Sequence, residues 1–375
     1  MSDLWPTKVI IMREKVALLG SNGIVSQRFQ QRLANHPWFE LSAVFGTQKN
    51  AGKSLDELTW NLPEPRPELP NIEVISCSAS DLNFELDKLN IQLVFSALPT
   101  TEAKEIEPIL RQGGKHVFSN SAAHRMDNDV PLVIPEINPE HLGLLDGQKS
   151  TNQGGSITCS TNCTVMPITI PLKPIAKQFG ITSLEVQSEQ SLSGGGWLMM
   201  ADAKKTGEVS SEIPGEAEKI AEEIVLLLGE FNGDNVTIAK FSTDISCRRV
   251  MRNYGHLVRV KVELSKTKSE EEILALLNNF TSIPQQLELP SAPRQPIIVI
   301  NSTIQPSVHQ WAGAESITNP DPAVDLRCGM AVVISDLQVS DNHVSFNAFS
   351  ENTIRGAAGG CLLLAELAFK QGLLV

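Results

Sequence analysis

The chain has 375 residues, 41% hydrophobic and 20% charged, a composition typical of a soluble globular protein with two or three folding units. Its 43 acidic and 31 basic residues give a net charge of −12. Nucleic-acid binding needs clustered Lys and Arg, so this balance argues against a nucleic-acid partner. No stretch approaches the roughly 18 consecutive apolar residues of a transmembrane helix, and no membrane partner is expected.

The N-terminus and the cysteines indicate a cytoplasmic protein. Residues 1–12 contain Pro6 and lack the apolar region and the cleavage site of a signal peptide, so they are expected to be a dispensable arm. The six cysteines are scattered and include no CxxC spacing, as is usual in a reducing compartment. We therefore expect neither a disulfide framework nor a bound metal.

Short apolar strands alternate with helices along residues 1–158. The strands are expected at 15–19, 41–45, 73–76, 93–97 and 116–119, and the helices at 24–33 and 102–111. Such alternation implies a parallel sheet with right-handed crossovers. The fold class is therefore α/β, with a Rossmann-type dinucleotide-binding domain first.

Residues 159–349 have a different pattern, in which longer alternating runs predict a mostly antiparallel sheet. These runs lie at 184–190, 256–264, 297–301 and 331–339, with helices at 163–179 and 216–228 and loops at 193–196 (flexible) and 284–296. We expect this part to be an α+β domain. A helix rich in small residues at 353–369, within the segment 350–375, is expected to pack back on the first domain and complete it.

A glycine-containing turn follows the first strand and opens the first helix. Glycines in this position let the backbone approach a pyrophosphate, which the helix N-terminus then stabilises. The candidate cofactor-binding residues are Gly20, Ser21, Asn22, Gly23, Ile24 and Val25. The pattern is GxxGxxS rather than the full GxGxxG, so the alternative is a turn that binds nothing.

The end of the second strand favours NADP over NAD. The chain continues Phe45-Gly46-Thr47 without the carboxylate that would bind a ribose 2′-hydroxyl, and Lys49 and Lys53 follow. Without that carboxylate, the two lysines and the hydroxyl of Thr47 suit a 2′-phosphate. The alternative is that both lysines belong to a solvated loop.

A cysteine stands at the expected start of a helix, in Asn162-Cys163-Thr164. The positive end of a helix dipole lowers the pKa of a thiol and favours the thiolate. His256, at the start of a strand, could accept its proton. The alternative is a buried structural cysteine, a role that Cys159 could also fill if it is not a redox neighbour.

Taken together, the motifs resemble those of aspartate-semialdehyde dehydrogenases, more the archaeal–fungal branch than the common bacterial one, over about residues 14–370. The motifs that carry this resemblance are Gly20-Ser21-Asn22-Gly23, Ala51-Gly52-Lys53, Ser121-Ala122-Ala123-His124-Arg125-Met126-Asp127, Asn162-Cys163-Thr164, Gln190, Ser193-Gly194-Gly195-Gly196, Gly215-Glu216-Ala217-Glu218-Lys219, Arg249 with His256, Leu289-Pro290-Ser291-Ala292-Pro293 and Asn352-Thr353-Ile354-Arg355-Gly356-Ala357-Ala358-Gly359. The resemblance implies NADP-dependent reduction of aspartyl phosphate to aspartate semialdehyde by a homodimer or homotetramer. It makes residues 159–349 the catalytic and dimerisation domain.

The resemblance also implies roles for individual residues. Cys163 matches the nucleophile that forms a thioester, His256 the general acid/base, and Gln190 the residue that orients the thioacyl group. The substrate-binding matches are Arg249 for the α-carboxylate, Glu216 for the α-amine, Arg125 and Lys219 for phosphate, and Asn162. The further cofactor-lining matches are Ser96, Ala97, Leu98, Ser193, Gly194 and Asn352. Each has a plainer alternative; Glu216 and Lys219, for instance, could be an ordinary surface pair on a helix.

The sequence departs from the family pattern between Cys247 and Leu257. Met251, Tyr254 and Leu257 replace a Pro, an Asp and a Thr, and Arg248 replaces an Asn. Arg248 and Arg252 could add positive charge beside the substrate or face solvent. Two alternatives to the implied activity stay open: an acyl-CoA reductase such as a malonyl-CoA reductase, and a catalytically silent cofactor-binding paralogue.

Overall fold

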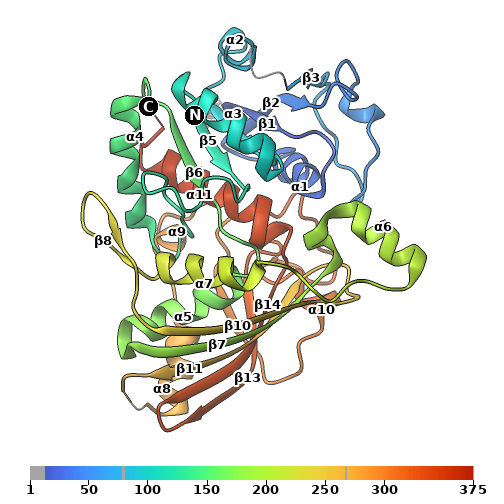
Figure 1. Ribbon diagram of the computed structural model, residues 1–375. Helices are drawn as coiled ribbons and strands as arrows, with labels where there is room; N and C mark the ends of the chain where they lie inside the picture. Colours follow the sequence, from blue (N-terminus) through green and yellow to red (C-terminus); the bar gives the residue numbers. More distant parts are fainter. Residues whose placement is uncertain (1–12, 78–80, 267, 375) are drawn as a thin grey trace, which may run out of the picture.

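The structure is a computed structural model that describes residues 13–77, 81–266 and 268–374; the expected N-terminal arm, residues 1–12, lies outside the described residues. Two six-stranded sheets form its framework, one above the other in Figure 1. None of the helices in these described ranges is long and apolar enough to cross a membrane. The α/β fold class predicted from the sequence is confirmed.

The first sheet is parallel throughout and has the strand order β3-β2-β1-β4-β5-β6. Its strands are β1 Glu14–Leu19, β2 Phe39–Gly46, β3 Ile75–Ser76, β4 Leu93–Ser96, β5 His116–Ser119 and β6 Ser156–Cys159. The predicted parallel sheet is therefore confirmed, with β6 added. Strand β6 has only four residues, and all of them are buried. Its sequence therefore lacks the alternation of apolar and polar residues by which a half-exposed strand is predicted.

Helices cover both sides of this sheet, as the alternation predicted. They are α1 Ile24–Leu33, α2 Leu82–Lys88, α3 Thr100–Gln112, α4 Leu145–Thr151 and, from the far end of the chain, α11 Gly359–Lys370. Leu363 and Leu364 of α11 pack in one core cluster with Val16, Leu18 and Phe29. Helix α11 therefore packs against the first sheet, and Figure 1 shows it between the two sheets.

The second sheet has the strand order β10-β7-β11-β14-β13-β12. Its strands are β7 Ile181–Gln190, β10 Ser242–Arg249, β11 His256–Leu264, β12 Ile297–Val299, β13 Val332–Ser340 and β14 His343–Ser350. The three central pairings are antiparallel, as predicted, but β10–β7 and β12–β13 at the edges are parallel. The sheet is therefore mixed, because its edge strands come from crossovers that the alternation does not reveal.

One face of the second sheet is apolar and the other is polar. Val258, Val260 and Val262 of β11 are buried in the core with α5 Met166–Phe179 and α8 Glu270–Asn278, whereas Arg259 and Lys261 between them are exposed. This is the alternation of a sheet with one covered face. Helix α7 Glu216–Leu227 runs along β10, between the two sheets in Figure 1.

Two expected boundaries are wrong. Helix α5 begins at Met166 rather than at residue 163, so Cys163 lies in the preceding turn. The expected flexible loop 193–196 is a 3-10 turn, Leu192–Gly195, that leads into α6 Gly196–Thr206. Its backbone is fixed, because the N–H of Leu192 and that of Ser193 donate to carbonyls of the β10–β11 turn at 2.7 and 3.0 Å.

The expected loop 284–296 is also more ordered than predicted. A short helix, α9 Ile283–Gln286, overlaps its start. The side chains of Ser282 and Gln285 form a capping box there, which stabilises a helix even of one turn.

Candidate active site

The candidate nucleophile and its base meet at the junction of the two sheets. Cys163 Sγ lies 3.1 Å from Nε2 of His256, the first residue of β11. Gly356 closes the site from the C-terminal segment: a Cβ on this glycine would stand 2.6 Å from Cys163 Cβ. The structure therefore brings together two residues that are 93 positions apart in the sequence.

The pKa values of Cys163 and His256 keep both side chains uncharged at neutral pH in the ligand-free site. Burial, together with the nearby Glu216 carboxylate, raises the pKa of the Cys163 thiol to about 12, against the opposing effect of Arg125 and Arg249. Burial, with Arg252 and Arg249, lowers the pKa of His256 to about 3. The expected lowering of the cysteine pKa by a helix dipole is wrong, because burial and a carboxylate outweigh it and the helix starts three residues later.

Ser191 orients the imidazole. Its backbone N–H donates to His256 Nδ1 at 3.1 Å, which leaves the proton of the neutral ring on Nε2, facing the sulfur. The Ser191 hydroxyl lies 3.3 Å from the same nitrogen and could accept from it when the ring is protonated. The backbone N–H of Gly255 donates to Asn352 Oδ1 at 2.7 Å, and the Ser191 hydroxyl donates to the same oxygen at 3.0 Å. Asn352, expected along the cofactor, thus also holds the segment that carries the imidazole.

The carboxylate of Glu216, on α7, connects two other expected residues. Glu216 Oε1 accepts a hydrogen bond from Asn162 Nδ2 at 2.9 Å and another from Gln190 Nε2 at 3.0 Å. Gln190 is the last residue of β7 and is buried. Spacing in the sequence could not show that the side-chain amides of Asn162 and Gln190, 28 residues apart, donate to the same oxygen of Glu216.

Arg249, the last residue of β10, lies beside the catalytic pair. Its NH1 donates to the Ser191 carbonyl at 2.9 Å, and the side chain is half-buried. A Cβ on Gly194 would stand 2.7 Å from this NH1 and 3.3 Å from His256 Cε1. The glycine at this position therefore permits the close approach of the loop to both side chains.

The two expected phosphate ligands differ in burial. Arg125 is buried near the cysteine loop, where its Nε donates to the Ser160 carbonyl at 3.0 Å and its NH2 to the Asn120 carbonyl at 2.9 Å. Lys219 is exposed on α7. Cys159 is fully buried, and burial raises the pKa of its thiol well above the ordinary value, which favours the structural alternative for that residue.

The two arginines in the segment that departs from the family pattern have protein partners of their own. Arg252 donates from Nε to the Gly255 carbonyl at 2.9 Å and from NH2 to the Glu189 carbonyl at 2.7 Å, so it braces the turn before His256. Arg248 is exposed on the outer face of the sheet and pairs with the Glu189 side chain. The charge of Arg248 lies on the outer face of the sheet, whereas that of Arg252 is close enough to lower the pKa of His256.

The turn between β1 and α1 is a narrow glycine cradle of a size that fits a phosphate group. Gly20 has a φ of +103°, and a Cβ there would stand 2.7 Å from Ser26 Oγ and 3.2 Å from the Ala97 carbonyl. The N-cap of α1 is Gly23, which has no side chain to occupy the first N–H groups of the helix. These open donors and the narrow glycine turn fit the pyrophosphate of a dinucleotide.

Other expected cofactor residues lie beside this turn or on the loop after β2. Ala97 N–H donates to the Leu19 carbonyl at 2.9 Å, which places 96–98 beside the turn. Asn50 Nδ2 donates to Ser21 Oγ at 3.1 Å and so connects the turn to the loop after β2. Thr47, Lys49 and Lys53 are exposed on or beside that loop.

Two residues of the site were not predicted: Ser191, described above, and Glu223. Glu223 Oε1 accepts from Arg125 NH1 at 2.9 Å, and its Oε2 accepts from the backbone N–H of Asn162 at 2.6 Å. Glu223 follows Glu216 by seven residues, a spacing that puts both carboxylates on one face of a helix. This spacing could have predicted Glu223 as a site residue.

Comparisons with known proteins agree with this geometry. Residues 15–145 match the family model described as semialdehyde dehydrogenase, NAD binding domain. The chain is 35% identical to an aspartate-semialdehyde dehydrogenase of Archaeoglobus fulgidus, over 96% of this chain and 99% of the relative. It is 31% identical to a malonyl CoA reductase (NADP) of Metallosphaera sedula, over 96% and 97% of the two chains.

A solved structure gives the same assignment. The fold matches a crystal structure of aspartate semialdehyde dehydrogenase with NADP from Candida albicans with a TM-score of 0.80 and 28% identity. The match covers 96% of this chain and 100% of the solved one. The chain belongs to the aspartate-semialdehyde dehydrogenase family.

Proposed function

We propose that the protein catalyses the NADPH-dependent reduction of L-4-aspartyl phosphate to L-aspartate 4-semialdehyde through a thioester on Cys163. The observation that carries this proposal is the 3.1 Å contact between Cys163 Sγ and His256 Nε2, with Glu216 and Gln190 held beside it. A substrate with one amine, one carboxylate and one phosphate needs both signs of charge around the nucleophile. Glu216 and Arg249 supply them.

The substrate contacts that we propose follow from charge. Arg249 holds the α-carboxylate through two parallel hydrogen bonds, and Glu216 faces the α-ammonium. Arg125 and Lys219 bind the phosphate; three of the five N–H donors of Arg125 already have protein partners, so at most two are available. Asn162 and Gln190 orient the acyl group from their shared contact with Glu216.

The residues of the chain carry out the covalent steps. In the tautomer with the ring hydrogen on Nδ1, toward the Ser191 hydroxyl, Nε2 of His256 takes the proton of the Cys163 thiol as the sulfur attacks the acyl carbon. A carbon–sulfur bond forms, the carbon–oxygen bond to phosphate breaks, and phosphate leaves. The backbone N–H of Cys163 stabilises the oxyanion of the tetrahedral intermediate. When bound, NADPH supplies the hydride that reduces the thioester carbonyl. His256 then gives a proton to the oxygen of the resulting hemithioacetal or to the departing thiolate.

The cofactor that we propose is NADP, held by the first domain. Gly20, Ser21 and Gly23 with the start of α1 would hold the pyrophosphate, and Lys49 and Lys53 the 2′-phosphate. The nicotinamide side would be bordered by 96–98, Ser193, Gly194 and Asn352. Support comes from the glycine cradle and from the solved relative with NADP.

The second candidate function is the reduction of an acyl-CoA, which the malonyl CoA reductase relative favours. Its substrate has no amine, so Glu216 would have no ligand partner. The experiment that decides is an NADP⁺ assay with two arms: aspartate semialdehyde plus phosphate, and malonate semialdehyde plus CoA. We expect turnover in the first arm only; turnover in the second arm alone would replace the proposed substrate, and none in either would favour the silent paralogue.

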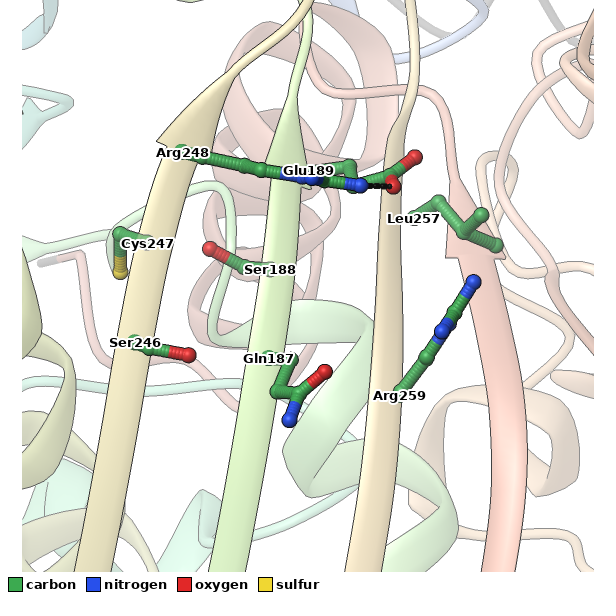
Figure 2. Close-up of a pocket in the computed structure, with 8 residues that line it drawn as sticks. All are labelled: Gln187, Ser188, Glu189, Ser246, Cys247, Arg248, Leu257 and Arg259. Atoms are coloured by element: carbon green, nitrogen blue, oxygen red, sulfur yellow. Dashed lines mark hydrogen bonds and ion pairs between the residues drawn. The ribbon is translucent and has the colours of Figure 1, made fainter. Parts of the chain in front are cut away.

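We also propose that two copies associate through the outer face of the second sheet. This face carries charges of both signs: in Figure 2, Arg248 of β10 extends across β7 to Glu189, while Leu257 and Arg259 stand on β11. Because this face carries positive and negative groups, a two-fold axis can place the positive groups of one copy against the negative groups of the other. Light scattering on Arg259→Glu tests this: we expect a smaller particle than for wild type, and an unchanged mass would contradict the placement.

The compartment that we propose is the cytoplasm. All six cysteines are free thiols in the structure, as the nucleophile of this mechanism requires.

A further inference from the structure

A buried carboxylate that the mechanism above does not use lies directly behind the nucleophile. Glu223, on the third turn of α7, is 3% exposed. Its two oxygens have different partners: Arg125 NH1 at 2.9 Å and the backbone N–H of Asn162 at 2.6 Å. Since both partners donate, both oxygens accept, as in an ionised carboxylate. Burial raises the pKa of Glu223, whereas Arg125 and the Asn162 N–H act in the opposite direction and favour the charged form.

The arginine extends this contact to the first sheet. Arg125 donates to the carbonyl of Asn120, just after β5, and to that of Ser160, just after β6. Glu223 and Arg125 therefore hold the segment 160–162 from both sides, by the Ser160 carbonyl and by the Asn162 N–H. The next residue is the nucleophile, so the pair fixes the backbone from which Cys163 Sγ reaches His256.

We propose that Glu223 is a positioning residue of the reaction: it orients the peptide before Cys163 and neutralises Arg125 beside the thiol. The proposal rests on the proposed function only in taking Cys163 as the nucleophile. It gives Arg125 a structural role in addition to any contact with phosphate. Because a misplacement of about 1 Å costs on the order of a hundredfold in rate, an anchor of this kind matters for turnover even without touching substrate.

The pair of Glu223 and Arg125 also affects the charge around the Cys163 thiol. The charged groups that act on the Cys163 thiol are Glu216, which raises its pKa, and Arg125 and Arg249, which lower it; the neighbouring His256 is neutral. Glu223 is the counter-charge of Arg125. Loss of the Glu223 charge should leave the arginine free to stabilise the thiolate, whereas loss of the arginine should do the opposite.

The test compares Glu223→Gln, Arg125→Gln and the control Glu222→Gln. Glu222 is the exposed neighbour on α7 and has the same charge. An amide at position 223 must turn an NH₂ group toward one of its two N–H donors, so the loop loses an anchor. We expect kcat to fall about 10- to 100-fold in Glu223→Gln and Arg125→Gln, and to change less than about twofold in the control.

The readout that a merely structural role would not give is thiol reactivity. Alkylation of Cys163 by iodoacetamide near pH 8, followed by peptide mass spectrometry, needs no substrate. We expect it to be about 3- to 10-fold faster in Glu223→Gln and slower by a similar factor in Arg125→Gln, since one pKa unit is a tenfold change in thiolate. Changes in the same direction in both variants, or a kcat of Glu223→Gln within about twofold of wild type, would overturn the proposal.

A second variant keeps the test decisive if Glu223→Gln does not fold. Glu223→Asp keeps the charge but is one methylene too short to reach both donors. We expect its kcat to fall while its alkylation rate stays within about threefold of wild type; an unchanged kcat would overturn the positioning role. If wild type turns over no aspartate semialdehyde, the proposed function fails, but the alkylation arms still test Glu223.

Discussion

The two halves of the active site are built in opposite ways. The dinucleotide half is shaped by backbone, with Gly20 and Gly23 forming the turn and Lys49 and Lys53 left exposed. The catalytic half consists of side chains that are buried and already hydrogen-bonded to one another, such as the imidazole of His256. A site that is organised before the ligand arrives spends little binding energy on ordering its groups.

This contrast predicts how each half responds to substitution. Truncation in the catalytic half removes a group and also releases its neighbours, so kcat should fall. Truncation in the dinucleotide half removes one contact from an intact backbone cradle, so KM for the cofactor should rise while kcat changes little.

The largest effect is expected for Cys163→Ala. Without the thiol no thioester forms, and turnover should fall by at least about 10⁴-fold, as for other nucleophile deletions. NADPH binding, measured by fluorescence titration, should stay within about twofold of wild type, because the nucleotide lies in the other half. Retention of more than about one per cent of activity would remove Cys163 as the nucleophile and make Cys159 the next candidate.

The next effect concerns the two charges assigned to the ends of the substrate. Glu216→Ala and Arg249→Ala should each cost about 2–4 kcal/mol, or roughly 30- to 1,000-fold in kcat/KM for aspartate semialdehyde. Arg249→Lys should not restore activity, because an ammonium cannot make the planar two-bond contact.

The control for this pair is Glu218→Ala, an exposed carboxylate on the same helix, which should change kcat/KM less than about twofold. The Glu216 variant decides between substrate classes. If it shows no loss with aspartate semialdehyde, the amino-acid assignment is wrong, although the thioester at Cys163 could still stand.

A smaller but diagnostic effect is the pH dependence of the ligand-free thiol. Because burial and Glu216 raise the pKa of Cys163 to about 12, the thiol keeps its proton at neutral pH. Its alkylation rate should rise about tenfold per pH unit from about pH 7 to pH 9, with no plateau. A plateau near the ordinary cysteine pKa would mean that the catalytic half does not bury the thiol as described.

The smallest effect is expected in the dinucleotide half. Lys53→Ala should raise KM for NADP about 5- to 10-fold and leave KM for NAD nearly unchanged, since only the 2′-phosphate loses a partner. Lys104→Ala, an exposed lysine on α3, is the control. Equal changes for the two cofactors would mean that Lys53 does not contact that phosphate.

The same contrast explains what the sequence could predict of the fold. Helix α1 and strand β11 have the predicted bounds, because each is one continuous periodic run. Strand β10 was missed, and it pairs in parallel with β7 about sixty residues earlier. Pairing at that distance depends on the tertiary fold rather than on local pattern.

The candidate site divides in the same way. The glycine turn is a local motif and could be found from spacing alone. The thiol pKa could not, because it depends on burial and on the carboxylate of Glu216, which approaches the cysteine turn from α7. Glu223 was missed for the same reason: its partners lie 61 and 98 residues away.

If Cys163 carries the acyl group, the thioester should accumulate when phosphate, which would accept that group, is withheld. The enzyme is mixed with aspartate semialdehyde and NADP⁺ in the absence of phosphate, quenched in acid, digested and analysed by mass spectrometry. We expect one aspartyl adduct, on the peptide that contains Cys163, and its loss when phosphate is added. An unmodified Cys163 alongside NADPH formation, or an adduct on Cys159 instead, would contradict this role of Cys163.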